Sequence, residues 1–424
     1  MSSSDAARQS PRMIVATASV ILSMTLIAIG NGLMFAYIPV RLGAEGFDPT
    51  WSGSILTGLA AGGIAGCLLT GAIVSRIGHA RAYMVLSALI VLSNAGVAAD
   101  VHPILWIAAR AIYGFGMCAL FIVAQSWLND AVGNAIRGRV MAVFYVSYIV
   151  AMGLGSLMMG GLDLHSAQAP LIGIVFTALS MLPVGMTRLA QPPAPQAASV
   201  ALRRSWQISP VGVMGMFAVG GLSMMIAGFA PIHATAKGFA QHEVAALMFA
   251  MPLGTLLLQL PFGWISDRTD RRYVLIAASL LVVVTGIVAA QLDSAPLAVI
   301  LAIYLVWSGA SESIYSLSSA HASDRASKED LVALSSTLLF AWSVAGFVTP
   351  AVGTVLTARF GTQSFIYVAI SIALVFALFV AWRVKTTRAV PAEETGNFAP
   401  MTAQAPLPVD LAFPTEDESV RLPS

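Results

Sequence analysis

The sequence predicts an all-α membrane protein in which twelve transmembrane helices form two pseudo-symmetric six-helix bundles. Its composition is 58% hydrophobic and only 10% charged, whereas soluble domains carry about 25% charged residues. Apolar runs of about 20 residues recur along the chain, and each is long enough to cross a hydrocarbon core of about 30 Å as a helix. Strands of a membrane barrel would alternate apolar and polar residues, which these runs do not do. A repeated segment indicates in addition that the chain consists of two similar halves.

That segment starts at Gly71 and has the sequence GAIVSRIGHAR. A related stretch, GWISDRTDRR, starts 192 residues later at Gly263. Three residues before the segment and one within it return at the same interval, since Pro39, Gly46, Phe47 and Arg76 reappear as Pro231, Gly238, Phe239 and Arg268. We therefore predict that the second half of the chain is built like the first.

The predicted spans of the first half are 13–37, 51–74, 82–98, 104–128, 140–161 and 171–186. The first of them is too long for the core of a signal peptide and lacks a clear small-residue cleavage site, so we expect it to be retained. Within the second span, small residues follow one another at intervals of four: Ser54, Gly58, Gly62, Gly66 and Thr70. Such a stripe allows close packing against a neighbouring membrane helix.

A Pro- and Ala-rich segment within 189–209 predicts a flexible linker between the two halves. The predicted spans of the second half are 211–232, 244–265, 273–290, 297–319, 331–356 and 365–382. These boundaries give an N-terminal segment 1–12, bundles 13–188 and 210–384, and a tail 385–424. The tail combines acidic residues with prolines, which predicts disorder.

The distribution of Lys and Arg predicts the orientation of the helices. Segments on the side of both termini hold 18 of these residues, the loops on the other side hold three, and Arg110 lies within a span. Because cytoplasmic segments carry the excess of Lys and Arg, we expect both termini in the cytoplasm and a multi-pass protein of the cell inner membrane. We expect a monomer in the lipid bilayer, with no nucleic-acid partner. The two cysteines, Cys67 and Cys118, lie in apolar runs, which favours packing over a disulfide framework or a metal site.

Two six-span halves, each with a Gly-x-x-x-Asp-Arg-x-Gly type of loop after its second span, resemble the major facilitator superfamily of secondary transporters. The resemblance covers residues 13–382. The segment RAIYGFG from Arg110 matches the Arg-x-x-x-Gly pattern of span four in that family. The segments QSWLND and RGRVMAVFYVSYIVAMGLGS are similar to a YcaD-like branch of bacterial carriers, which implies no particular substrate.

In this family the loop aspartate is thought to latch the cytoplasmic side of the outward-open state by facing a helix N-terminus of the other half. Two sets of residues match the loop pattern: Gly71, Arg76, Gly78 and Arg81 in the first copy, and Gly263, Asp267, Arg268, Arg271 and Arg272 in the second. Ser75 stands at the position of the acid in the first copy, and Asp270 replaces the glycine in the second. The resemblance therefore implies a latch at Asp267 only. The alternative is that the loop charges only fix the orientation.

Two charged residues lie well inside the predicted spans, Arg110 in span four and Glu312 in span ten. A charge at the centre of a helix costs about 2.5–3.5 kcal/mol on insertion scales, so each is a candidate functional residue. Polar residues accompany both at helical spacing: Tyr113 and Gln125 follow Arg110, and Glu312 lies in a stripe with Ser308, Ser311, Tyr315 and Ser316. The resemblance implies that spans one, four, seven and ten line a central cavity.

We expect Arg110 to offer a fixed cation to an anionic or polar group of a substrate. We expect Glu312 to contact the substrate or to carry a proton, because desolvation favours the neutral form of a carboxyl group. At a rise of 1.5 Å per residue, the depths of Arg110 and Glu312 in the membrane differ by roughly 14 Å, so the two would form separate sites. Asn31 lies nearer to the depth of Arg110. The alternatives are ordinary interhelical hydrogen bonds for Glu312 and for Asn31.

The predicted function is secondary active transport of a small molecule by alternating access, with proton coupling at Glu312. No phosphate-binding loop and no catalytic nucleophile–base set is visible, so we expect neither an ATP-driven pump nor an enzyme, and no cofactor or metal. The alternative is a transporter-like receptor or accessory protein that carries nothing. Uptake and efflux both stay open, although GLGSLMMGG in span five lacks the Gly-Pro pair typical of antiporters in the superfamily, which disfavours drug efflux.

Overall fold

The computed structural model describes residues 3–131, 134–187, 200–292, 295–327 and 329–388, and all regular structure within them is helical. The first half contains α1 (Ser3–Ala44), α2 (Pro49–Ile77), α3 (His79–Ala99), α4 (Pro103–Ala131), α5 (Asn134–Met159) and α6 (Gln168–Met186). The second half contains α7 (Leu202–Ile208), α8 (Pro210–Ser223), η1 (Met224–Gly228), α9 (Phe229–Ala236), α10 (Gln241–Ser266), α11 (Arg271–Ala289), α12 (Leu297–Ser323), α13 (Leu331–Phe360) and α14 (Ser364–Thr386).

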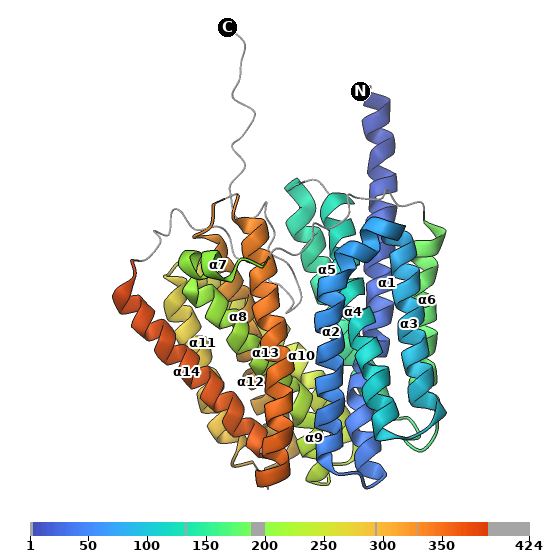
Figure 1. Ribbon diagram of the computed structural model, residues 1–424, viewed down its shortest axis with the longest axis vertical. Helices are drawn as coiled ribbons and strands as arrows, with labels where there is room; N and C mark the ends of the chain where they lie inside the picture. Colours follow the sequence, from blue (N-terminus) through green and yellow to red (C-terminus); the bar gives the residue numbers. More distant parts are fainter. Residues whose placement is uncertain (1–2, 132–133, 188–199, 293–294, 328, 389–424) are drawn as a thin grey trace.

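Twelve helical segments of the described residues are long and apolar enough to cross a membrane, with α8, η1 and α9 together forming the seventh. Figure 1 shows them running side by side, with α1 beginning and α14 ending at the same end of the molecule, which we name the terminal end. The other end is named the opposite end. The predicted fold class and number of spans are confirmed.

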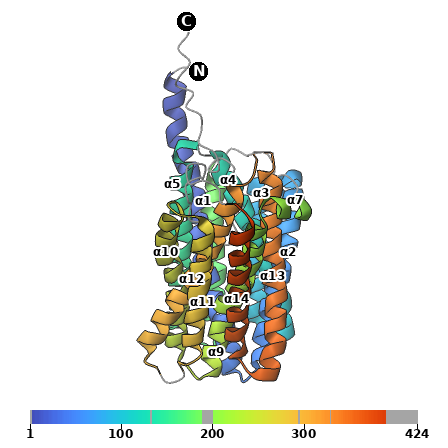
Figure 2. The same cartoon turned by 90° about the vertical axis from the view of Figure 1, so that its left-hand side faces the viewer.

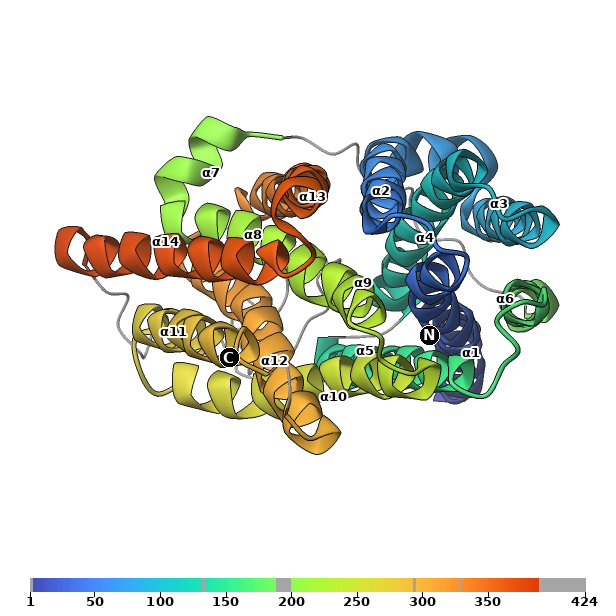
Figure 3. The same cartoon turned by 90° about the horizontal axis from the view of Figure 1, so that it is seen from below.

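The helices gather into two groups, α1–α6 and α7–α14, which Figure 3 shows side by side in a view along the helices. The groups meet where α5 packs on α10 and where α2 packs on α13. At the opposite end, where Figure 2 shows α9, this helix of the second group also packs against α1 and α2 of the first group. Each group therefore supplies one wall of the space between them.

The repeat in the sequence corresponds to a repeated turn. After α1, Gly46 has a φ of 75° and Phe47 N–H donates to Leu42 O at 3.0 Å. After α9, Gly238 has a φ of 82° and Phe239 N–H donates to Ala234 O at 3.0 Å. This is the Schellman type of helix ending, in which glycine takes the left-handed conformation. The Gly-Phe pairs are thus repeated because both helices end in the same way.

The small-residue stripe of the second span packs against α4, as predicted. A Cβ atom added to Gly62 would lie 1.8 Å from Ala111 O, and one added to Gly66 would lie 2.5 Å from Phe115 O. The second half repeats this approach, since a Cβ atom on Gly254 of α10 would lie 1.9 Å from Leu305 O of α12. Helix pairs in both halves therefore contact each other through their backbones.

Several predicted boundaries were wrong. The segment predicted as a loop at Gly71 is helical, because no helix-breaking residue interrupts α2 before Gly78, whose φ is 79°. Residues 3–12, predicted as a segment before the first span, are helical in α1, and the membrane-span part of that helix begins at Val15. The flexible linker predicted within 189–209 contains the helix α7. The π-helical turn η1 was not predicted. The rest of the linker, 189–199, and the tail from 389 lie outside the described residues, so the domain division and the disordered tail stay predictions.

Candidate functional site: a cavity between the two halves

A cavity of about 240 Å³ lies between the two halves of the chain. Side chains from α1, α2, α4 and α5 form one wall, and side chains from α8, η1, α10, α12 and α13 form the other. Ligand sites commonly occupy about 300–1,000 Å³ and are mostly apolar. The cavity volume lies just below this range, so it suits a small ligand. The cavity is the candidate binding site because both halves contribute to it.

Contacts between the halves are close at the opposite end of the molecule. Gln241 at the start of α10 donates through Nε2 to Met159 O and, at 2.8 Å, to Leu162 O. Met159 is the last residue of α5 and Leu162 lies three residues beyond it, in the region where a helix leaves its last C=O groups without partners in the helix itself. The second half thus supplies a cap for a helix of the first, and this contact helps to close the opposite end.

Glu312 lines the cavity from α12, where it is partly exposed. Ser223 Oγ of α8 donates to Glu312 Oε1 at 2.5 Å. Gln259 Nε2 of α10 lies 3.5 Å from Glu312 O, and Tyr145 OH of α5 donates to Gln259 Oε1 at 2.8 Å. Tyr145 belongs to the other half, so a chain of hydrogen bonds joins the two halves beside the carboxyl group.

On the facing wall, Asn31 connects two tyrosines. Tyr113 OH donates to Asn31 Oδ1 at 3.1 Å, and Asn31 Nδ2 donates to Tyr148 OH at 3.2 Å. The three residues come from α1, α4 and α5, and all line the cavity. The structure therefore brings together the predicted residues Asn31 and Tyr113. The amide oxygen and the amide nitrogen of Asn31 both have hydrogen-bond partners within the protein.

Arg110 does not line this cavity, contrary to the sequence-based expectation. Only 2% of the residue is exposed, and its guanidinium lies over the Tyr113 ring, with Cζ 3.9 Å from the ring centroid. It borders a separate void of about 30 Å³ beside Ile38, Ser52 and Gly228. Arg110 and Tyr113 are three residues apart on α4 and therefore share one face of the helix, so helical spacing alone does not show which of the two side chains reaches the cavity. Arg110 therefore supports the cavity wall through Tyr113 instead of facing the cavity.

The polar stripe of span ten faces the cavity only in part. Ser308 and Glu312 line it, whereas Ser311, Tyr315 and Ser316 are buried outside its lining. Further along the same helix, Ser319 Oγ lies 3.8 Å from Met216 Sδ of α8. Gln125 in α4 is also buried outside the lining. These four predicted cavity residues are corrected to packing positions, because neighbouring helices cover them.

The acid of the second loop bonds within its own half. Asp267 Oδ1 accepts from Arg271 NH1 at 3.3 Å, and Arg271 Nε donates to Asp324 Oδ2 at 2.7 Å. Arg268 lies over the Trp264 ring, with its Cζ 4.1 Å from the centroid. In the first copy, Ser75, Arg76 and Arg81 are exposed. The two loops thus differ in structure as they differ in sequence.

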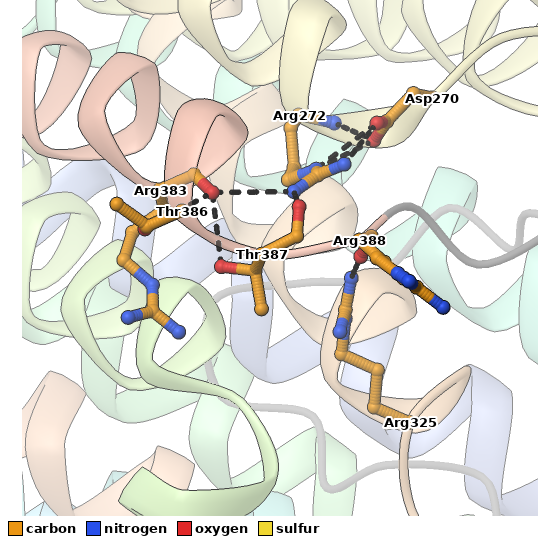
Figure 4. A network of polar contacts seen from close by, with 7 residues as sticks. All are labelled: Asp270, Arg272, Arg325, Arg383, Thr386, Thr387 and Arg388. Atoms are coloured by element: carbon orange, nitrogen blue, oxygen red, sulfur yellow. Dashed lines mark hydrogen bonds and ion pairs between the residues drawn. The ribbon is translucent and has the colours of Figure 1, made fainter.

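Asp270, which replaces the glycine of the loop pattern, is the N-cap residue of α11. It accepts from Arg272 N–H at 3.0 Å and pairs with the Arg272 guanidinium at 2.6 Å (Figure 4). Burial alone would raise the pKa of Asp270, but these bonds to Arg272 hold it below its usual value. Its φ is −60°, whereas Gly78 at the equivalent position has 79°. The aspartate is tolerated because the second loop makes an N-cap where the first makes a left-handed turn.

Arg272 and Arg325 also hold the end of α14. Arg272 NH1 donates to Thr387 O at 2.8 Å, and Arg325 NH2 donates to Arg388 O at 3.0 Å (Figure 4). Carbonyl groups at a helix C-terminus carry partial negative charge, so cationic side chains stabilise them. Arg272, predicted as part of the latch, therefore has a structural role in this conformation.

Sequence reasoning did not single out four residues of the site: Tyr145, Tyr148, Ser223 and Gln259. Tyr145 and Tyr148 stand at i, i+3 in VFYVSYIV of span five, and Gln259 is the one amide in the apolar segment LLLQLPF of span eight. Polar groups within apolar spans were therefore the available signal. Ser223 had none, since many serines occur in the spans.

Two groups of membrane helices meet around a central cavity, an arrangement that is typical of secondary transporters. The sequence profile of the Major Facilitator Superfamily matches residues 20–209 and 211–413 of this chain. The chain belongs to that superfamily, so it is a secondary transporter of the membrane by family and not an enzyme.

Curated relatives and solved structures agree with this membership. The chain is 25% identical over 361 residues to an uncharacterised MFS-type transporter, YcaD, of Escherichia coli O7:K1, covering 84% of this chain and 93% of the relative. It is equally similar over 362 residues to an uncharacterised MFS-type transporter of Enterobacter sp. (strain 638), with the same coverage. The resemblance to YcaD-like carriers is thereby confirmed.

Solved structures share the fold at low sequence identity. The nucleoside transporter NupG gives a TM-score of 0.64 at 14% identity, over 88% of this chain and 99% of that one. The xylose transporter XylE from E. coli, in a partially occluded inward-open conformation, gives a TM-score of 0.67 at 13% identity, over 90% of this chain and 100% of that one.

Proposed function

We propose that the chain moves a small molecule by alternating access to the central cavity, and that Glu312 couples this movement to protons. The observation that carries the proposal is the cavity itself, which takes one wall from each half and has a carboxyl group in it. Rocking of two halves about a central site is the usual mechanism of such folds. The terminal end, with its excess of Lys and Arg, would face the cytoplasm of the inner membrane.

Glu312 is suited to the coupling because a proton can neutralise it before the cavity closes. An isolated carboxylate is costly in a space without water, so its protonation state and the closing of the cavity are linked. The other titratable residues in the lining are Tyr113, Cys118, Tyr145 and Tyr148. None of these is ordinarily charged at neutral pH, which leaves Glu312 as the group that responds to a physiological pH gradient.

Transport itself can be tested by counterflow in proteoliposomes. Metabolites and drugs that raise the melting temperature of the purified protein would be loaded inside vesicles, and entry of the same labelled compound would be followed. We expect entry that saturates and that requires the protein. Compounds that bind without any counterflow, across all hits of the screen, would instead favour the receptor or accessory alternative.

We expect the two loops to contribute unequally to the transport rate. Asp267→Asn should slow counterflow by about two- to fivefold, which corresponds to the roughly 0.3–1 kcal/mol of an exposed contact between a charge and a helix terminus. Ser75→Ala should leave the rate unchanged, because Ser75 Oγ donates only to Ala72 O of its own helix at 2.9 Å among the bonds of the described residues. A slow Ser75 variant beside a normal Asp267 variant would reverse this assignment.

A further inference from the structure

Among the described residues, the lining of the central cavity includes one charged side chain. Glu312 is the only Asp, Glu, Lys, Arg or His among the described residues that line it. Arg110, the one cation nearby in the sequence pattern, lies over Tyr113 and borders the smaller void. An anionic ligand would therefore meet a carboxyl group and no counter-charge.

Most polar groups of the lining are already bonded within the protein. Asn31 is bonded to two tyrosines, and Tyr145 OH donates to Gln259. Ser343 Oγ donates to Leu339 O at 2.9 Å and Thr255 Oγ1 to Met251 O at 3.4 Å. A ligand rich in hydroxyl groups would lose its bonds to water and find few replacements, which costs affinity.

The remaining lining is apolar, aromatic and rich in sulfur. It includes five methionines: Met117, Met152, Met224, Met248 and Met251. Methionine adapts its shape to different ligands, and aromatic faces attract organic cations. Phe35, Phe121 and Trp342 supply further rings in the lining. These walls suit the apolar body of a ligand, and Glu312 suits a positive charge on it.

We propose that the cavity binds a small amphipathic monocation, whose charge pairs with Glu312 and whose apolar body lies against the aromatic and methionine side chains. This inference rests on the proposed transport function and names its substrate class. One carboxylate cannot hold a proton and pair with a cation at the same time, so binding of the two is mutually exclusive. The carrier then exchanges protons for the cation. The exchange depends on Glu312 and not on a Gly-Pro pair in span five, which this chain lacks.

Binding of labelled benzyltrimethylammonium to the purified protein tests the inference. This probe is a permanent cation, so its own charge does not change with pH. We expect saturable binding that benzenesulfonate and xylose do not displace. Affinity should rise from pH 5.5 to pH 8.5, because the carboxylate form of Glu312 binds the cation. Glu312→Gln should weaken binding at least tenfold and remove the pH dependence.

Two variants serve as controls. Glu312→Asp keeps the carboxylate and should keep measurable binding, which separates loss of charge from loss of folding. Glu243→Gln removes a carboxylate at the start of α10, outside the cavity lining, and its amide oxygen can still accept from Ala240 N–H. It should bind as the unaltered protein does. Unchanged affinity in Glu312→Gln, or binding of benzenesulfonate in place of the cation, would overturn the inference.

The two proposals can fail separately. If an anion or a sugar shows counterflow, the transport function stands and the cation assignment is wrong. If benzyltrimethylammonium binds at Glu312 but never enters proteoliposomes under any imposed gradient, the site assignment stands and transport is wrong.

Discussion

Glu312→Gln is expected to abolish transport driven by a pH gradient. Glutamine has nearly the shape of a protonated glutamate and can still accept from Ser223 Oγ, but it cannot release or take up a proton. One pH unit is worth about 1.4 kcal/mol per proton, so a gradient of about two units can sustain roughly 100-fold accumulation. The variant should lose this accumulation entirely.

The measurement is accumulation of the substrate found by counterflow, with and without an imposed pH gradient. Glu243→Gln is the matched control and should accumulate substrate normally. Coupled accumulation that survives in Glu312→Gln would exclude Glu312 as the proton carrier. Counterflow of the Glu312→Gln variant without a gradient tests a second role of the residue. It should also be lost if the Glu312 carboxylate pairs with the substrate.

Gly62→Ala is expected to lower the stability of the protein strongly. The new Cβ atom would lie 1.8 Å from Ala111 O and 2.7 Å from Ala111 C of α4. Overpacking a core typically costs about 1–3 kcal/mol, and here the obstacle is a helix backbone, which cannot change rotamer. The helices must separate, so we expect a cost at or above the upper end of that range and a clear fall in melting temperature.

The adjacent residue provides the control for this prediction. A Cβ atom on Gly63 would have its nearest neighbour, Gly114 O, at 4.0 Å, which is an ordinary contact. Gly63→Ala should therefore melt close to the unaltered protein, and Gly254→Ala in the second half should behave like Gly62→Ala. Equal melting temperatures for the Gly62 and Gly63 variants would show that the close contact between α2 and α4 does not limit stability.

Local patterns predicted most of the fold but only part of the site. The spans follow from apolar length, and the stripe at Gly58, Gly62 and Gly66 follows from spacing within one helix. Glu312 and Ser308 could be selected because polar groups in lipid must face protein or water. The same rule cannot distinguish a cavity from a helix–helix contact, which is why Ser311, Tyr315, Ser316 and Gln125 were assigned wrongly to the cavity.

Arg110 illustrates the limit of reasoning from single helices. A buried charge needs compensation, and its sequence neighbours suggested a ligand as the source. The structure supplies the Tyr113 ring instead, at 3.9 Å from Cζ. Gln259 is the opposite case, because a single amide in an apolar segment gives no hint that it accepts from Tyr145 of the other half.

Composition, run length and the 192-residue repeat are properties of the chain alone, so they were enough to predict a twelve-span membrane protein with two related halves. Only the tertiary structure decided which polar side chains share the cavity and which charge remains in it. That outcome depends on how helices from both halves rotate and pack against one another. Residues such as Tyr145, Gln259 and Ser223 are distant in the chain, so their joint environment around Glu312 exists only in the folded protein.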